Sequence, residues 1–313
     1  MSNTSNSELF GPVLEYPDSS ARARYDALVG IDDIKRQIVT EATVLINPQI
    51  LEQWSAEHHG TILAAVRAVE QRTPLIVLAG DVGTGKTELA ESVGDAIARR
   101  LGVDSLTLFP MSLSARGRGL VGEMTTLITQ AFEHVRDSLG AARDNKGRVR
   151  NAAILLIDEA DAIAQSRELT QMHHEDRAGV NALIRAIDGL RRDKVPVLTI
   201  MCTNRSDALD PAIARRAVQV FSFTRPTLEQ RCHVLTSTLA GTGVSADDIE
   251  TAALALGSNG ARSWGATYSD LRQRFIPNLV LDAFALNSPI TGAGLVAAAQ
   301  QFLPTRPFGG GDD

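Results

Sequence analysis

Apolar runs with the length of buried strands recur along the first two thirds of the chain, and segments with helical periodicity separate them. The five runs cover residues 75–79, 106–109, 153–157, 195–202 and 218–223. Between them, apolar residues recur at steps of three and four, as in a helix with one buried face. Because strands that are apolar throughout are buried on both faces, the pattern predicts a three-layer α/β fold, a parallel sheet with helices on each side.

The pattern changes after Pro226, where the strand signals stop and helical segments remain at residues 228–239, 247–256 and 269–286. Pro277 lies inside the last of these segments. Proline lacks an N–H and clashes with the preceding turn, so we expect it to kink or restart that helix. The change of pattern predicts a small all-helical second domain.

Composition at the two ends completes the predicted domain organisation. Residues 1–24 are rich in Ser and Asn and are expected to form a flexible N-terminal arm, and the Pro- and Gly-rich residues 304–313 a flexible tail. Between them we place the large α/β domain over residues 25–224 and the small helical lid domain over residues 225–303.

Charge and hydropathy narrow the range of partners. The 313 residues carry a formal net charge of −6, and 44% of them are hydrophobic, which is normal for a globular protein. An acidic chain is a poor match for a protein that grips nucleic acid through a broad basic face, although it leaves room for a local basic channel. No apolar run approaches the ~20 residues of a membrane span, and the N-terminus is polar, unlike a signal peptide. We therefore expect a cytoplasmic protein with no membrane partner.

The segment GDVGTGKT at residues 80–87 fits the pattern G-x-x-x-x-G-K-[ST] in full. It follows an apolar strand and opens an amphipathic helix, which makes a chance Gly-rich turn a poor explanation. Its glycines let backbone N–H groups point at phosphate oxygens, and the helix dipole adds a favourable field. Lys86 is then expected to neutralise the β- and γ-phosphates, and the Thr87 hydroxyl to ligate Mg²⁺.

Two acids, Asp158 and Glu159, end the apolar run at residues 153–157, about seventy residues after the phosphate-binding loop. At that strand tip Asp158 is placed to hold Mg²⁺ through water, and Glu159 to orient and deprotonate an attacking water. The alternative is an acidic pair that caps the next helix. The preceding phosphate-binding loop favours ATP hydrolysis.

Asn204 and two arginines follow the next strand. Asn204 is a candidate to hydrogen-bond the attacking water or the γ-phosphate, although Asn is also an ordinary turn residue. Arg215 and Arg216 end a short helical segment. An arginine offered to the γ-phosphate of a neighbouring subunit would stabilise the transition state, and the alternative is a solvated basic helix end.

Together these motifs resemble the AAA+ superfamily over roughly residues 28–286. Residues 80–87 match its Walker A motif, Asp158 and Glu159 its Walker B motif, and Asn204 its sensor 1. The resemblance implies a P-loop NTPase sheet in the order 5-1-4-3-2, hexameric rings, and ATP with Mg²⁺ bound at the subunit interfaces. The nucleotide-binding residues that it implies are Gly30, Ile31, Gly80, Asp81, Val82, Gly83, Thr84, Gly85, Lys86, Thr87, Glu88 and Arg272.

Finer features resemble the pachytene-checkpoint and thyroid-receptor-interactor group, in its bacterial version. Residues 123–137 resemble one helix of that group, and Leu120, Val121 and Gly122 resemble a pore loop that grips a polypeptide. The resemblance implies a protein remodeller that partly unfolds or disassembles a HORMA-domain client in a bacterial anti-phage signalling system. It also favours Arg216 over Arg215 as the arginine offered to a neighbouring subunit.

The chain departs from that group at three places. Leu120 replaces the usual pore aromatic, and Leu271 stands where the sensor-2 arginine belongs, with Arg272 next to it as our candidate. An N-terminal adaptor domain has little room, and residues 41–73 are instead expected to form helices before the first strand. The alternatives are a nucleic-acid motor or loader of the same fold, another AAA+ chaperone or unfoldase, and a nucleotide-gated scaffold, which Glu159 disfavours.

Overall fold

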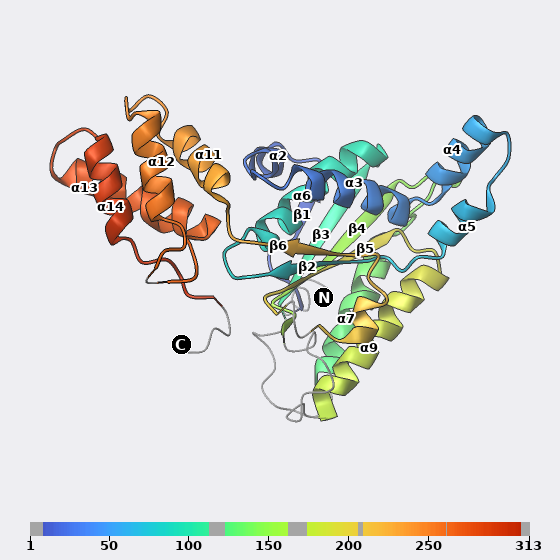
Figure 1. Ribbon diagram of the computed structural model, residues 1–313. Coiled ribbons are helices and arrows are strands. Elements are labelled where there is room, and N and C mark those ends of the chain that lie inside the picture. The colour runs from blue at the N-terminus through green and yellow to red at the C-terminus, as the bar shows by residue number, and fades with distance from the viewer. Residues whose placement is uncertain (1–8, 113–122, 162–173, 206–208, 261, 308–313) are drawn as a thin grey trace. The chain divides into compact units, whose positions relative to one another are not determined.

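The computed structural model describes residues 9–112, 123–161, 174–205, 209–260 and 262–307 (Figure 1). The chain forms two compact units. The larger one comprises Met1–Ala27, Asp32–Ala79 and Thr87–Ser222, and the smaller one Leu28–Ile31, Gly80–Lys86 and Phe223–Asp313. The smaller unit therefore includes most of the phosphate-binding loop, which the predicted boundaries had assigned to the large α/β domain.

A six-stranded mixed sheet forms the centre of the larger unit, in the order β1-β3-β4-β5-β2-β6. The strands β2, β5, β4 and β3 pair in parallel, and β1 pairs antiparallel with β3. β1 was not expected from the sequence, and its antiparallel pairing makes the sheet mixed, so the expectation of a purely parallel sheet was wrong. The strands are β1 (Leu14–Tyr16), β2 (Leu75–Gly80), β3 (Ser105–Ser112), β4 (Asn151–Asp158), β5 (Val197–Thr203) and β6 (Gln219–Phe223).

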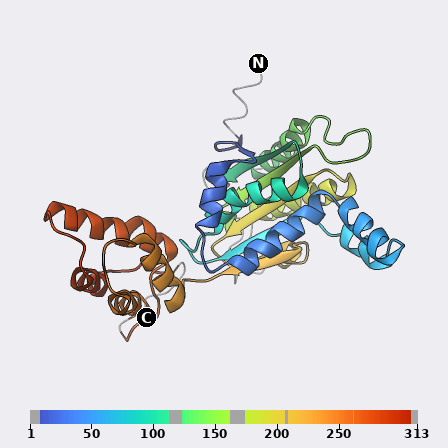
Figure 2. The same ribbon diagram turned by 90° about the horizontal axis from the view of Figure 1, so that it is seen from above.

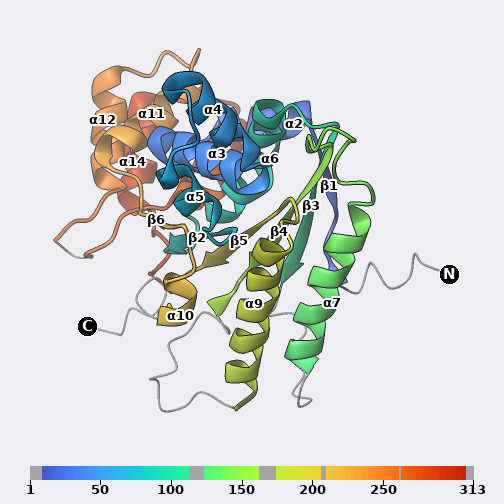
Figure 3. The same cartoon turned by 90° about the vertical axis from the view of Figure 1, so that its right-hand side faces the viewer.

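Helices cover both faces of this sheet. In Figures 1 and 3, α7 and α9 run side by side along one face, and their apolar residues share a core cluster with side chains of β2, β3, β4 and β5. Figure 2 shows α3 and α6 across the other face. The helices are α2 (Ser19–Asp26), α3 (Asp32–Ile46), α4 (Gln49–His59), α5 (Ala64–Glu70), α6 (Lys86–Leu101), α7 (Glu123–Ser138), α9 (His174–Arg192) and α10 (Pro211–Ala214).

The part of residues 1–24 that the structure describes is ordered, not the flexible arm that was expected. Tyr16 is 3% exposed, and its hydroxyl donates to the carbonyl of Glu91 on α6. The close approach requires Gly94, because a Cβ there would lie 2.3 Å from the Tyr16 ring. The backbone N–H of Asp18 donates to the buried Asp95, 2.8 Å away. Tertiary packing on α6 thus orders this segment.

The smaller unit contains helices around its own apolar core. The N-cap Thr227 and Gln230 form a capping box at the start of α11. Pro277 stands at the start of α13, directly after a π-helical turn, which confirms the expected restart. The elements are α11 (Leu228–Thr238), α12 (Ala246–Ala255), η2 (Asp270–Phe275, the π-helical turn), α13 (Ile276–Ala285) and α14 (Gly292–Gln301).

Residues 304–307 do not form a flexible tail. The N–H and hydroxyl of Thr305 donate to the two carboxylate oxygens of Asp270, 3.0 and 2.7 Å away. Asp270 is 1% exposed and also accepts from the N–H of Thr267 and the guanidinium of Arg274. Burial alone would raise the pKa of Asp270, but the hydrogen bonds from Thr305, Thr267 and Arg274 outweigh it and lower this pKa.

The depressed pKa makes the stabilisation by Asp270 depend on pH. It is fully present above the unfolded pKa of about 4 and is lost as the pH falls through the lower folded pKa. We expect Asp270→Asn to lower the free energy of unfolding by about 2 kcal/mol at pH 7. The Asn side-chain NH₂ group would face the N–H and O–H donors that now bind the Asp270 carboxylate. The difference from wild type should shrink below pH 4. Urea unfolding between pH 3 and 7 measures it, with the exposed Asp282→Asn as control; equal stability of Asp270→Asn and wild type at pH 7 would contradict the assignment.

Within the described residues, no helix combines the length and the apolar character that crossing a membrane requires.

Candidate functional site

The phosphate-binding loop curves around the end of β2. Gly80 has φ +150°, and a Cβ there would lie 2.1 Å from the carbonyl oxygen of Phe223. Gly83 has φ +73°, and a Cβ there would lie 2.8 Å from the Thr267 hydroxyl. Glycine therefore serves both backbone conformation and close packing at these positions. The helix α6 begins at Lys86, so the loop leads into a helix N-terminus, which favours anions.

Side chains of the loop fold back onto it. The ammonium of Lys86 donates to the carbonyls of Gly80 and Asp81, at 2.9 and 2.8 Å, and only 6% of the residue is exposed. The Thr84 hydroxyl donates to the same Asp81 carbonyl at 2.7 Å. These contacts hold the positive charge of Lys86 within the curve of the loop, where phosphate oxygens would be neutralised.

The segment Leu28–Ile31 belongs to the same compact unit as the loop. The Tyr268 hydroxyl donates to the Val29 carbonyl at 3.2 Å, and the Gln230 amide donates to the Gly30 carbonyl at 3.1 Å. Two helical segments of the smaller unit thereby fix the backbone of the segment that was expected to bind the nucleotide. Ile31 lies in the same segment, and its role in nucleotide binding stays a prediction.

The sensor-2 position falls on the π-helical turn η2. Leu271 is fully buried in the core of the smaller unit, so it is a packing residue. Arg272 is exposed. Burial raises the pKa of Tyr268, and the positive charge of Arg272 opposes the rise, so Arg272 lies near the residue that holds Val29. Its assignment to nucleotide binding stays a prediction.

In the larger unit, Thr87 and Asp158 meet at the end of β4. The Thr87 hydroxyl donates to a carboxylate oxygen of Asp158 at 3.3 Å. A hydroxyl and a carboxylate are hard oxygen ligands of the kind that Mg²⁺ prefers, so these residues fit the predicted ion. Thr87 directly follows Lys86 along the chain, so the chain itself links this pair to the phosphate-binding loop.

Glu159 adopts a backbone conformation that is rare for residues other than glycine. Its φ is +50°, which costs on the order of 1–3 kcal/mol and is concentrated at functional sites. Its N–H donates to the Asp158 carboxylate at 2.9 Å, and its own carboxylate accepts from the Ser112 hydroxyl at 3.1 Å. Glu159 is exposed, so water reaches its carboxylate. Ser112 ends β3 and was not identified from the sequence.

Asn204 is held by Asp161, which was not identified from the sequence. One carboxylate oxygen of Asp161 accepts from the Asn204 N–H and from the Thr203 hydroxyl, both at 2.7 Å. The other accepts from the Asn204 side-chain amide at 3.0 Å. Because β4 and β5 are parallel neighbours, Asn204 lies at the same sheet edge as Asp158. Asp161 stands three residues after Asp158, and that spacing was the available signal.

The two candidate arginines differ in their surroundings. Arg215 is exposed at the end of α10. Arg216 pairs with Asp188 on α9 at 3.2 Å and donates to the Ala212 carbonyl at 3.2 Å. These contacts orient Arg216 without burying it, since about a third of its side chain is exposed. Which arginine serves a neighbouring subunit stays a prediction.

Three further predictions concern Glu88, Val82 and the pore loop. The Glu88 carboxylate pairs with Arg24 of α2 at 3.2 Å, so its contact is structural, and its assignment to nucleotide binding stays a prediction. Val82 is 40% exposed on the loop. The predicted pore loop, Leu120, Val121 and Gly122, lies outside the described residues.

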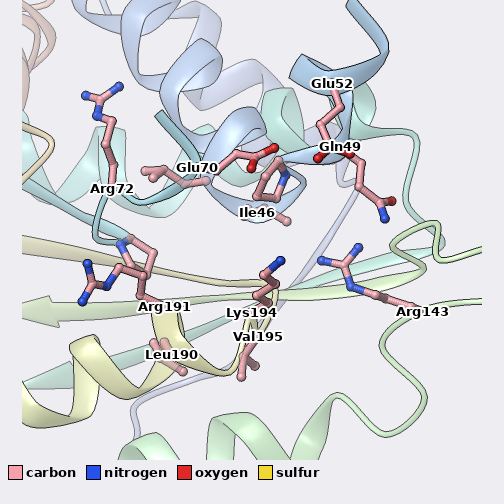
Figure 4. Close-up of a pocket in the computed structure, with 13 residues that line it drawn as sticks. Ile46, Gln49, Glu52, Glu70, Arg72, Arg143, Leu190, Arg191, Lys194 and Val195 are labelled. Carbon is pink, nitrogen blue, oxygen red and sulfur yellow. The ribbon is translucent and has the colours of Figure 1, made fainter. Parts of the chain in front are cut away.

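A separate cavity of about 220 Å³ lies in the larger unit, at the amino ends of β2 and β5 (Figure 4). Arg143, Lys194 and Glu70 line it, and burial together with the nearby Glu52 raises the pKa of Glu70. The residues with nucleotide chemistry follow the carboxyl ends of β3, β4 and β5, so this cavity is distinct from the candidate site.

Comparison with known proteins gives the family of the chain. Residues 76–225 match the ATPase family associated with various cellular activities (AAA). The chain is 45% identical over 301 residues to the CD-NTase-associated protein 6 of Escherichia coli strain MS 115-1, and the match covers 96% of each chain. The chain belongs to the AAA ATPase family.

Two solved structures that contain Trip13 proteins are similar to this AAA ATPase. It matches one chain of the E. coli MS115-1 HORMA:CdnC:Trip13 complex with a TM-score of 0.88 and 43% identity, over 96% of this chain and 98% of that chain. It matches the Rhizobiales Trip13 structure with a TM-score of 0.71 and 44% identity, over 96% and 100% of the two chains. This AAA ATPase is therefore Trip13-like, and resembles bacterial members.

Proposed function

We propose that this Trip13-like AAA ATPase hydrolyses ATP with Mg²⁺ and uses the cycle to change the conformation of a HORMA-domain protein. The observation that carries the hydrolysis is the group formed by Thr87, Asp158 and Glu159 at the end of β4, where a metal-ligand pair adjoins an exposed carboxylate. A phosphate-binding loop that continues directly into Thr87 supports it.

Each residue has a distinct part in the proposed reaction. The loop N–H groups and Lys86 bind the phosphates, and Thr87 and Asp158 would hold Mg²⁺, which would neutralise negative charge on the bound nucleotide. Glu159 accepts a proton from the water that attacks the γ-phosphorus, and the bond to the β–γ bridging oxygen breaks to leave ADP and phosphate. Asn204, oriented by Asp161, positions that water.

The proposed assembly is a hexameric ring in the cytoplasm. Each subunit of the proposed ring has the sheet order and the helical lid domain of AAA+ proteins. Arg216 of one subunit stabilises the transition state at the nucleotide site of the next subunit. In this proposal Leu120, Val121 and Gly122 grip the client, as the resemblance to the pore loop implies. The likeness to a chain of a HORMA:CdnC:Trip13 complex and to a CD-NTase-associated protein supports a HORMA-domain client within bacterial anti-phage signalling.

A substrate trap tests the client. Glu159→Gln should bind ATP without turnover and therefore retain its client, so a HORMA-domain protein added at equimolar concentration should co-elute with it in ATP and dissociate in ADP. Duplex and single-stranded DNA added to wild type in parallel should leave the ATPase rate unchanged. DNA stimulation without HORMA retention would replace the proposal with a nucleic-acid motor.

A further inference from the structure

Arg225 connects the phosphate-binding loop to the C-terminal segment. Its Nε donates to a carboxylate oxygen of Asp81 at 2.7 Å, and its Nη2 lies 2.6 Å from the same oxygen. Its Nη1 donates to the carbonyls of Gly265 at 2.5 Å and Thr305 at 2.8 Å. The side chains of Arg225 and Asp81 are 14% and 20% exposed, so solvent screens this ion pair weakly.

The C-terminal segment also contacts Asp270, Arg274 and Phe275. Besides the two hydrogen bonds from Thr305 to Asp270, the Arg274 guanidinium donates to the Thr305 hydroxyl at 3.1 Å. The Phe302 ring packs edge-on against Phe275, with centroids 5.4 Å apart. We call residues 302–307 the C-terminal strap.

One short segment, residues 267–270, contacts both the strap and the loop. Asp270, which holds Thr305, also accepts from the N–H of Thr267 at 3.0 Å. Two residues later the N–H of Ser269 donates to the carbonyl of Gly83, in the middle of the loop, at 3.1 Å. The loop is therefore held at two points: at Asp81 by Arg225, which also holds the strap, and at Gly83 by Ser269, which directly precedes Asp270.

We propose that the C-terminal strap is part of the nucleotide-binding machinery, with Arg225 as the positioning residue that transmits its effect to the loop. The inference rests on the proposed function. Two physical effects carry it: a loop held in place before binding loses less conformational entropy when it closes on phosphate, and Arg225 neutralises the Asp81 carboxylate, which would otherwise repel a triphosphate bound to the same loop.

The role of the strap is tested by the binding of a fluorescent, non-hydrolysable ATP analogue to the full-length protein, to two shortened chains and to Arg225 variants. A chain that ends at Leu303 should raise Kd about tenfold, and so should Arg225→Ala, whereas a chain that ends at Pro307 should bind like wild type. Arg225→Lys keeps the charge without the guanidinium fork and should fall between them. Thermal melts of each variant control for folding, and should the shorter chain fail to fold, the two Arg225 variants decide.

A double substitution separates positioning from general destabilisation. If Arg225 acts by neutralising Asp81, adding Asp81→Asn to Arg225→Ala should recover roughly threefold in affinity, while a merely structural role gives additive losses. Wild-type-like binding by the chain ending at Leu303, or additive losses in the double variant, would refute the proposed role of the strap. Either result would leave the proposed function standing. Absence of analogue binding by the wild-type protein would refute the proposed function along with the role of the strap.

Discussion

Replacing Glu159 by Gln should abolish ATP hydrolysis and leave ATP binding near wild-type strength. Gln has the same size and can still accept the hydrogen bond from Ser112, but its amide cannot take a proton from water. Loss of a general base lowers the rate by about 10²–10⁴. Phosphate release measures turnover, and a fluorescent ATP analogue measures binding.

The matched control is Glu133→Gln, an exposed glutamate on α7, which should retain wild-type turnover. Turnover by Glu159→Gln within a few-fold of wild type would remove Glu159 from the role of base. Loss of binding together with turnover would instead show that the strained backbone at Glu159 supports the fold of the site, since a residue with φ +50° depends on its surroundings.

Arg216→Ala should reduce hydrolysis by about 10³ or more, which corresponds to about 4 kcal/mol of transition-state stabilisation, without loss of ATP binding. Its stability should change little, because the ion pair with Asp188 is about a third exposed and such pairs contribute roughly 0–1 kcal/mol. Steady-state kinetics and analogue binding separate the two effects. Arg215→Ala is the neighbouring control and should hydrolyse ATP normally.

Mixed subunits test whether Arg216 acts on a neighbouring site. Lys86→Ala should lose nucleotide binding, yet its subunits still carry Arg216. Mixing them with Arg216→Ala subunits should therefore restore part of the activity, because an intact loop then faces an intact arginine. A mixture as inactive as its components would count against action between subunits. A large loss in Arg215→Ala with none in Arg216→Ala would transfer the role to Arg215.

The sequence predicted those elements whose signal is local. The apolar runs correspond to β2 to β6. The signal is strongest for β2, β4 and β5, because strands buried on both faces leave continuous hydrophobic stretches. The three-residue β1 was missed because its stability comes from pairing Leu14 with Leu108 and from packing Tyr16 beside Gly94, which are distant in the chain. The order of residues 304–307 likewise depends on the buried Asp270, not on composition.

The same distinction holds at the candidate site. The phosphate-binding loop and the pair Asp158–Glu159 are contiguous motifs, so spacing alone identified them. Ser112 and Asp161 act through contacts made by folding, on residues 47 and 43 positions away. Arg225 also lay outside any motif, because its partner Asp81 is 144 residues away. Apart from the proximity of Asp161 to the Asp158–Glu159 pair, these orienting contacts leave no periodic or contiguous pattern.

The central claim is that water held by Glu159 cleaves a triphosphate bound at residues 80–87 with Mg²⁺ held by Thr87 and Asp158. Phosphate release by the purified, folded protein over a range of protein concentrations tests it most directly. We predict release from ATP that requires Mg²⁺, stops on chelation and is absent in Glu159→Gln. Folded protein that releases no phosphate with Mg²⁺ at any concentration would contradict the account.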